Sequence, residues 1–142
     1  MGSHTHTQSG EQTGEQTEHA ERELDALFAQ LGPANPPHIA ERRRAPRERC
    51  RAIGSIRVVG ITRANTATPI VVFDANNYGI GFFTRGPIVA NADATATVVF
   101  PDGQVRGLDG TIIRARLISP GWYQAALLFL HPKLILQHLK PK

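Results

Sequence analysis

Residues 50–60 read CRAIGSIRVVG, and their side chains alternate with a period of two. The odd-numbered positions from Ile53 to Val59 fall on one face of an extended chain, and the even-numbered positions from Gly54 to Gly60 fall on the other. An amphipathic helix would instead repeat its apolar positions every three or four residues. This stretch therefore predicts a β-strand near residues 50–62 and indicates a fold built from strands.

The sequence after this strand contains further segments that are rich in Val, Ile, Thr, Phe and Tyr and are separated by turn residues. They predict strands near residues 68–74, 79–84, 94–100, 105–118 and 121–130. Pro101-Asp102-Gly103 is typical of a hairpin turn, because proline presets φ and glycine accepts a positive φ. Gly107 and Gly110, inside the longest segment, predict a bend or a bulge there. Strands without an intervening helix predict a mainly β fold, a six-stranded antiparallel β-barrel.

The two ends of the chain differ in character from the strands. Residues 1–17 contain almost no apolar side chains and are expected to form a disordered tail. Residues 18–31 predict an amphipathic helix, because the apolar side chains follow helical spacing at Leu24, Leu27, Phe28 and Leu31. Gly32 and Pro33 stop this helix and begin a proline-rich linker up to residue 40, so that the barrel domain spans residues 41–142. A short C-terminal helix over Lys133–Leu139 is expected to close one end of the barrel.

The charges are unevenly distributed along the chain. Residues 11–25 contain six acidic side chains, whereas six arginines lie within the ten positions from Arg42 to Arg51. Such a basic cluster indicates an anionic partner, with a solvated charge run as the alternative. The single cysteine, the polar N-terminus and the absence of an apolar run of roughly 18 residues predict a cytoplasmic protein with no membrane span.

The sequence lacks the common signatures of catalysis. It contains no GxSxG, no P-loop and no HExxH. Asp74 is the only acid within the first three predicted strands, and a lone carboxylate is poorly suited to acid–base chemistry. We therefore expect neither an enzyme nor a resident metal or cofactor.

A first binding motif, Arg42-Arg43-Arg44-Ala45-Pro46-Arg47, leads directly into the first predicted strand. Pro46 favours an extended conformation at the residue before it, and an extended chain places Arg43 and Arg47 on the same side. A guanidinium fork matches paired acceptors, such as phosphate oxygens or O6 and N7 of guanine. The motif therefore predicts a site for an anionic ligand, although a solvated basic run has the same composition.

A second motif, Asp74-Ala75-Asn76-Asn77-Tyr78-Gly79-Ile80-Gly81, lies between the second and third predicted strands. Asp and Asn side chains bond to nearby backbone groups and favour turns. Gly79 and Gly81 permit a positive φ and the close approach of a ligand. On its own this segment is equally typical of an ordinary hairpin turn.

In this order and about 27 positions apart, the two motifs resemble those of the PilZ domain family, RxxxR followed by (D/N)xSxxG. Arg43 and Arg47 match the first motif, and Asp74 and Gly79 match the second, whereas Asn76 occupies the position of the family serine. The resemblance extends over residues 41–131 and implies the family's six-stranded barrel.

The resemblance also implies a function, that of a non-catalytic receptor that binds cyclic di-GMP and relays it by a conformational change. The implied ligand-binding residues are Arg42, Arg43, Arg44, Arg47, Asp74, Asn76 and Gly79. In the family, an arginine directly before RxxxR, here Arg42, is associated with binding an intercalated pair of the dinucleotide. The relay implies a downstream protein partner.

Two other functions remain open at this stage. A degenerate PilZ-like adaptor would bind a protein partner without nucleotide, through the apolar face of the predicted helix. A nucleic-acid-binding barrel would also use a basic groove, but the chain has few aromatic side chains for base stacking, so no DNA partner is expected. The helix over residues 18–31 is compatible with a monomer, in which it packs on its own barrel, and with a homodimer.

Overall fold

The computed structural model describes residues 18–32, 46–60 and 67–142. The chain divides into two compact units, residues 1–33 and 34–142. A helix over residues 18–30 makes up most of the described part of the first unit, which confirms the predicted helix to within one residue. The predicted tail over residues 1–17 and nearly all of the linker lie outside the described residues.

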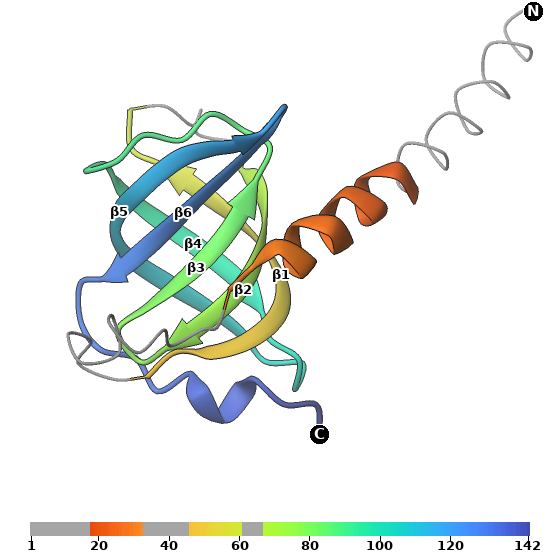
Figure 1. The fold of residues 1–142 in the computed structure, drawn as a ribbon. Coiled ribbons are helices and arrows are strands. Elements are labelled where there is room, and N and C mark those ends of the chain that lie inside the picture. Colours follow the sequence, from red (N-terminus) through yellow and green to blue (C-terminus); the bar gives the residue numbers. More distant parts are fainter. Residues whose placement is uncertain (1–17, 33–45, 61–66) are drawn as a thin grey trace, which may run out of the picture. The chain divides into compact units, whose positions relative to one another are not determined.

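The second unit is one antiparallel sheet of six strands, which are β1 (Glu48–Val58), β2 (Thr68–Asn76), β3 (Gly79–Thr84), β4 (Asp93–Val99), β5 (Val105–Ser119) and β6 (Trp122–Phe129). The spatial order is β1-β2-β3-β6-β5-β4, and β4 pairs with β1 to close the ring (Figure 1). The mainly β class and the predicted strands are confirmed. β1 ends at Val58 rather than near residue 62, because a turn follows in which Gly60 has a φ of 83°.

Apolar side chains that point into the ring form the core. β4 shows the alternation most plainly, since Ala94, Ala96 and Val98 are buried and the residues between them are exposed. The largest core side chains come from all around the ring and include Ile56, Ile70, Phe82, Leu108, Ile112 and Leu127. Their burial from water supplies the main favourable term in folding.

The hairpin predicted at Pro101-Asp102-Gly103 is confirmed. The carbonyl of Phe100 accepts a hydrogen bond from Gly103 N–H at 2.8 Å, and Phe100 N–H donates to Gln104 O at 2.9 Å. Gly103 has a φ of 90°, a conformation that glycine adopts without a steric penalty.

The bulge in β5 lies at a different position from the one predicted. Pairing with β4 continues without interruption past Gly107 and Gly110, whereas pairing with β6 shifts between Ile113 and Arg116. Arg114 has a φ of 55°, which is uncommon for a residue with a side chain. Gly110 serves close approach instead, because a Cβ atom there would lie 2.1 Å from the carbonyl oxygen of Leu128.

The C-terminal segment closes one end of the ring, as expected, although its helix is only the 3-10 turn η1 (Leu136–His138). Ile135 and Leu139 are buried and join the core, while Leu134 points outward and is 70% exposed. Within the described residues, no helix has the length and apolar character needed to cross a membrane.

Candidate ligand-binding site

The two motifs meet at a side-chain contact between Arg47 and Asp74. Arg47 directly precedes β1 and Asp74 lies in β2, and the Nη1–Oδ1 distance between them is 3.2 Å. The two side chains are only 15% and 7% exposed. The β1–β2 register is irregular after Arg49 and the β2–β3 register is irregular before Asp74. These irregularities distinguish the segment around the ion pair from the regular sheet beside it.

Asn76 organises the turn between β2 and β3. Its Oδ1 accepts hydrogen bonds from the backbone N–H groups of Tyr78, at 2.8 Å, and of Gly79, at 3.0 Å. This is the local side-chain-to-backbone bonding that makes Asn common in turns. The asparagine therefore supports the turn directly, and it also lines a hollow on the adjacent surface.

Gly79 and Gly81 keep the surface beside this turn flat. A Cβ atom at Gly79 would lie 2.6 Å from the Leu127 carbonyl oxygen. One at Gly81 would lie 2.6 Å from Asp74 Oδ1 and 2.7 Å from the Phe73 ring. Neither glycine has a positive φ, so the turn conformation that the sequence also allowed is not their role. Both instead allow other atoms of the fold to pack closely against the backbone.

Arg114 and Arg116 approach the same surface from β5, beside the bulge. Both side chains are exposed, and among the described residues neither guanidinium takes part in a hydrogen bond or an ion pair. A backbone conformation that is sparsely populated for arginine is a feature that clusters at functional sites. The bulge therefore adds cationic groups beside Arg47.

Two hollows of about 400 and 390 Å³ lie on this surface, and both are bordered by Arg47 and Arg114. The first is also lined by Asn76, Tyr78, Gly79, Ile113, Leu128, Phe129, Leu130 and Pro132. The second is also lined by Phe73, Asp74, Gly81, Ala115, Arg116, Gln124, Ala125 and Ala126. Each is within the usual size of a small-molecule site, about 300–1,000 Å³.

The chemistry of the two hollows differs. The first has an apolar wall that includes Ile113, Leu128 and Pro132, which suits the face of a planar ring. The second is polar, and among the described residues that line it Asp74 is the one acid, with Arg116 and Gln124 beside it. The described residues that line the two hollows include three arginines, at positions 47, 114 and 116, and the carboxylate of Asp74. This set favours an anionic ligand that also carries hydrogen-bond donors.

Four of the residues predicted for the site, Arg47, Asp74, Asn76 and Gly79, are brought together around the two hollows. Arg42, Arg43 and Arg44 lie outside the described residues. Sequence reasoning missed Arg114, Arg116 and Gln124. An Arg-x-Arg pair within the otherwise apolar stretch of residues 112–118 is the one signal in the sequence for the first two.

Two findings on the described residues concern nucleophilic and metal chemistry. Burial, followed by the negative charge of Asp74, raises the pKa of the Cys50 thiol to about 12, so the thiol stays protonated at neutral pH. Within the described part of the chain, no three His, Cys, Asp or Glu side chains lie together so as to hold a metal ion.

Comparison of the chain with protein-family models and with curated proteins finds no match. The interpretation of the site therefore depends on the chemistry of its own residues and on the motifs quoted above.

Proposed function

We propose that this protein is a non-catalytic receptor for cyclic di-GMP, with a PilZ-like β-barrel as its binding domain. The observation that carries the proposal is the contact between Arg47 and Asp74, which unites the two motifs between two hollows of ligand size. The arginines around it supply the positive charge that a dinucleotide with two phosphates requires.

The order of donors and acceptors favours guanine in particular. Guanine presents the acceptors O6 and N7 next to the donors N1–H and the exocyclic amine. Arg47 offers donors and Asp74 offers acceptors side by side, which is the complementary arrangement. Adenine has a donor where guanine has O6, so the same pair would face it with mismatched groups.

The two hollows give the ligand distinct surroundings. The apolar wall of the first suits the flat face of a base, while Arg47 and Arg114, which border both hollows, would bind the phosphates. Arg42, Arg43 and Arg44 precede Arg47 in the chain and would add further phosphate or base contacts. The ligand would then change the conformation of this basic segment, and the change would be relayed to a protein partner.

Calorimetric titration with cyclic di-GMP tests the proposal. Arg47→Ala and Asp74→Ala should each weaken binding about tenfold to a hundredfold, because each removes contacts worth about 1–3 kcal/mol. Arg57→Ala is the matched control, since Arg57 is an exposed arginine of β1 that borders neither hollow. Cyclic di-AMP should bind much more weakly than cyclic di-GMP.

The outcomes separate the receptor from the adaptor. Absence of heat with wild-type protein, or unchanged affinity in both site variants, would contradict the proposal. The first result would favour a PilZ-like adaptor that binds a protein without nucleotide. A stoichiometry near two per chain would support an intercalated pair of ligand molecules.

A further inference from the structure

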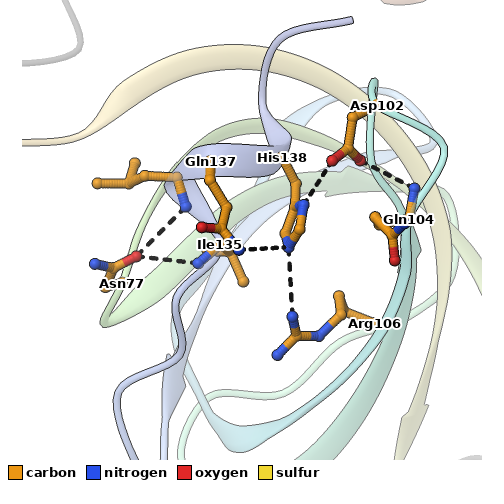
Figure 2. Close-up of polar contacts among 8 residues, drawn as sticks. Asn77, Asp102, Gln104, Arg106, Ile135, Gln137 and His138 are labelled. Carbon is orange, nitrogen blue, oxygen red and sulfur yellow. Dashed lines mark hydrogen bonds and ion pairs between the residues drawn. The ribbon is translucent and has the colours of Figure 1, made fainter. Parts of the chain in front are cut away.

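The C-terminal segment, which comprises residues 130–139, is bonded to the turn that forms one wall of the first hollow. The backbone carbonyl of Asn77 accepts from Lys133 N–H at 2.8 Å. Its side-chain Oδ1 accepts from Ile135 N–H at 3.1 Å and from Leu136 N–H at 3.4 Å (Figure 2). One residue of the β2–β3 turn thus accepts three backbone hydrogen bonds from the segment.

The other end of the segment is bonded to the β4–β5 hairpin. His138 Nδ1 lies 2.6 Å from Asp102 Oδ2, with both side chains about 10% exposed (Figure 2). The backbone N–H of Asp102 also donates to the His138 carbonyl at 3.3 Å. An ionised carboxylate only accepts, so Nδ1 is the donor. In the neutral ring, Nε2 is then the acceptor, and it faces Arg106 and Gln137 at 3.4 Å.

Between these two attachments, the segment covers the end of the ring with Ile135 and Leu139. Its first residues also belong to the candidate site. Leu130 and Pro132 line the first hollow together with Asn76 and Tyr78, the two neighbours of Asn77 in the turn. A ligand in this hollow would therefore contact both the segment and the turn that holds the segment.

We propose that docking of residues 130–139 is thermodynamically coupled to ligand binding. Asn77 connects the segment to the site, and the Asp102–His138 contact, which we call the latch, holds the segment from outside the site. The inference rests on the proposed receptor function. The docked segment completes the wall of the hollow and holds the turn in place, so the ligand binds the docked state more tightly. Coupling is reciprocal: the ligand stabilises docking, and any change that favours undocking weakens the ligand.

The coupling has a quantitative form. When only a fraction of the molecules has the segment docked, the apparent affinity falls in proportion to that fraction. A latch variant that leaves about one molecule in ten docked should therefore bind about tenfold more weakly. This effect requires no contact between the latch and the ligand, and neither Asp102 nor His138 borders the two hollows.

Hydrogen exchange of the wild-type protein, with and without saturating cyclic di-GMP, is the first test. The backbone N–H groups of Lys133, Ile135, Leu136, His138 and Leu139 all donate within the docked arrangement. They should exchange more slowly when ligand is bound. Exchange of these amides at the same rate in both samples would overturn the proposal.

The second test compares Asp102→Asn with Asp93→Asn by calorimetric titration and exchange. Asp93 is a carboxylate at the start of β4, where it accepts a hydrogen bond from Thr111 and lies away from the segment. Asp102→Asn should lower the affinity for cyclic di-GMP about fivefold or more, which is a typical coupling between sites. The affinity and the fraction of molecules with a docked segment should fall by the same factor. Asp93→Asn should bind like the wild type.

The possible failures are distinguishable. Wild-type protein that binds no cyclic di-GMP would overturn the proposed function and this inference with it. Binding that is normal in the wild type and unchanged in a folded Asp102→Asn variant with undocked residues 133–139 would overturn the coupling alone. Circular dichroism establishes that each variant is folded.

Discussion

Two turns at the same end of the ring use similar residues for different purposes (Figure 1). The β2–β3 turn contains Asn76 and Gly79, and the β4–β5 hairpin contains Asp102 and Gly103. In both, a side-chain oxygen accepts a backbone N–H two residues further on, from Tyr78 in one and from Gln104 in the other. From the sequence alone, each is an Asx-type turn followed by glycine.

The difference between the turns lies in what surrounds them. The charge of Asp102 is matched inside the fold, by Gln104 N–H and by His138. Beside the β2–β3 turn, Asp74 is matched by Arg47, but Arg114 and Arg116 of β5 have no ion-pair partner among the described residues and border the hollows. A turn motif thus becomes a candidate site through unmatched charge nearby, and not through its own hydrogen bonds.

The largest effect that would sharpen this comparison is expected from Gly81→Ala. The added Cβ would collide with Asp74 Oδ1 and the Phe73 ring, so we expect a loss of about 1–3 kcal/mol in the free energy of unfolding together with weaker ligand binding. Gly107→Ala in β5 is the control, because a Cβ atom there meets nothing within 4 Å. Chemical denaturation measures the free energy of unfolding of both variants. Equal stability of the two would contradict the close packing of Asp74 and Phe73 against Gly81.

A smaller effect is expected from Gly103→Ala in the hairpin. Space is open around Gly103, but its φ of 90° strains any residue with a side chain, at a cost of about 1–2 kcal/mol. Ligand affinity should fall only as far as the latch at Asp102 is loosened. Thermal unfolding measures the loss of stability, and calorimetric titration measures the loss of affinity. Unchanged stability would show that the hairpin relaxes to another turn type.

Asn76→Ala should cost about 1 kcal/mol in stability, because two backbone N–H groups lose their acceptor. Asn76→Asp retains an acceptor oxygen and should retain most of this stability. If both variants unfold at the same denaturant concentration, the Asn76 side chain does not stabilise the turn.

The smallest effect concerns pH. Desolvation acts to raise the pKa of Asp102, but the hydrogen bond from Gln104 N–H, the contact with His138 and nearby positive charge outweigh it and lower the pKa below its ordinary 3.8. The stability that this carboxylate contributes is therefore present above pH 3.8 and is lost as the pH falls through the lower value in the folded state. Thermal unfolding of wild-type and Asp102→Asn protein should differ at about pH 7 and converge at strongly acidic pH; a constant difference would contradict this assignment.

Local sequence was sufficient to predict the strands, because alternation such as that around Ile56 and Ala96 follows from one buried face. The Pro101–Gly103 hairpin was also predictable from its residues. The bulge at Arg114 was not, since arginine has no local preference for a positive φ and the conformation depends on pairing with β6. The second attachment of the C-terminal segment, between Asp102 and His138, joins residues 36 positions apart and depends on the closed ring.

The residues of the candidate site divide in the same way, into those that local sequence predicts and those that depend on strand pairing. Asp74 and Gly79 were found because a turn motif is contiguous in sequence. Arg116 and Gln124 were not, because they become neighbours only through the β5–β6 register, in which they are paired. Gly81 was predicted to permit a positive φ and the close approach of a ligand, whereas the structure shows the side chains of Asp74 and Phe73 packed against it.

The closure of the sheet has a consequence for how this molecule meets other proteins. In an open sheet, the border strands present unpaired N–H and C=O groups that another chain can extend by strand addition. In the described ring, β1 pairs with both β2 and β4, so no strand is left as a border. Recognition of a partner is therefore left to side chains, turns and the chain ends, and the same closure removes the template for edge-to-edge aggregation.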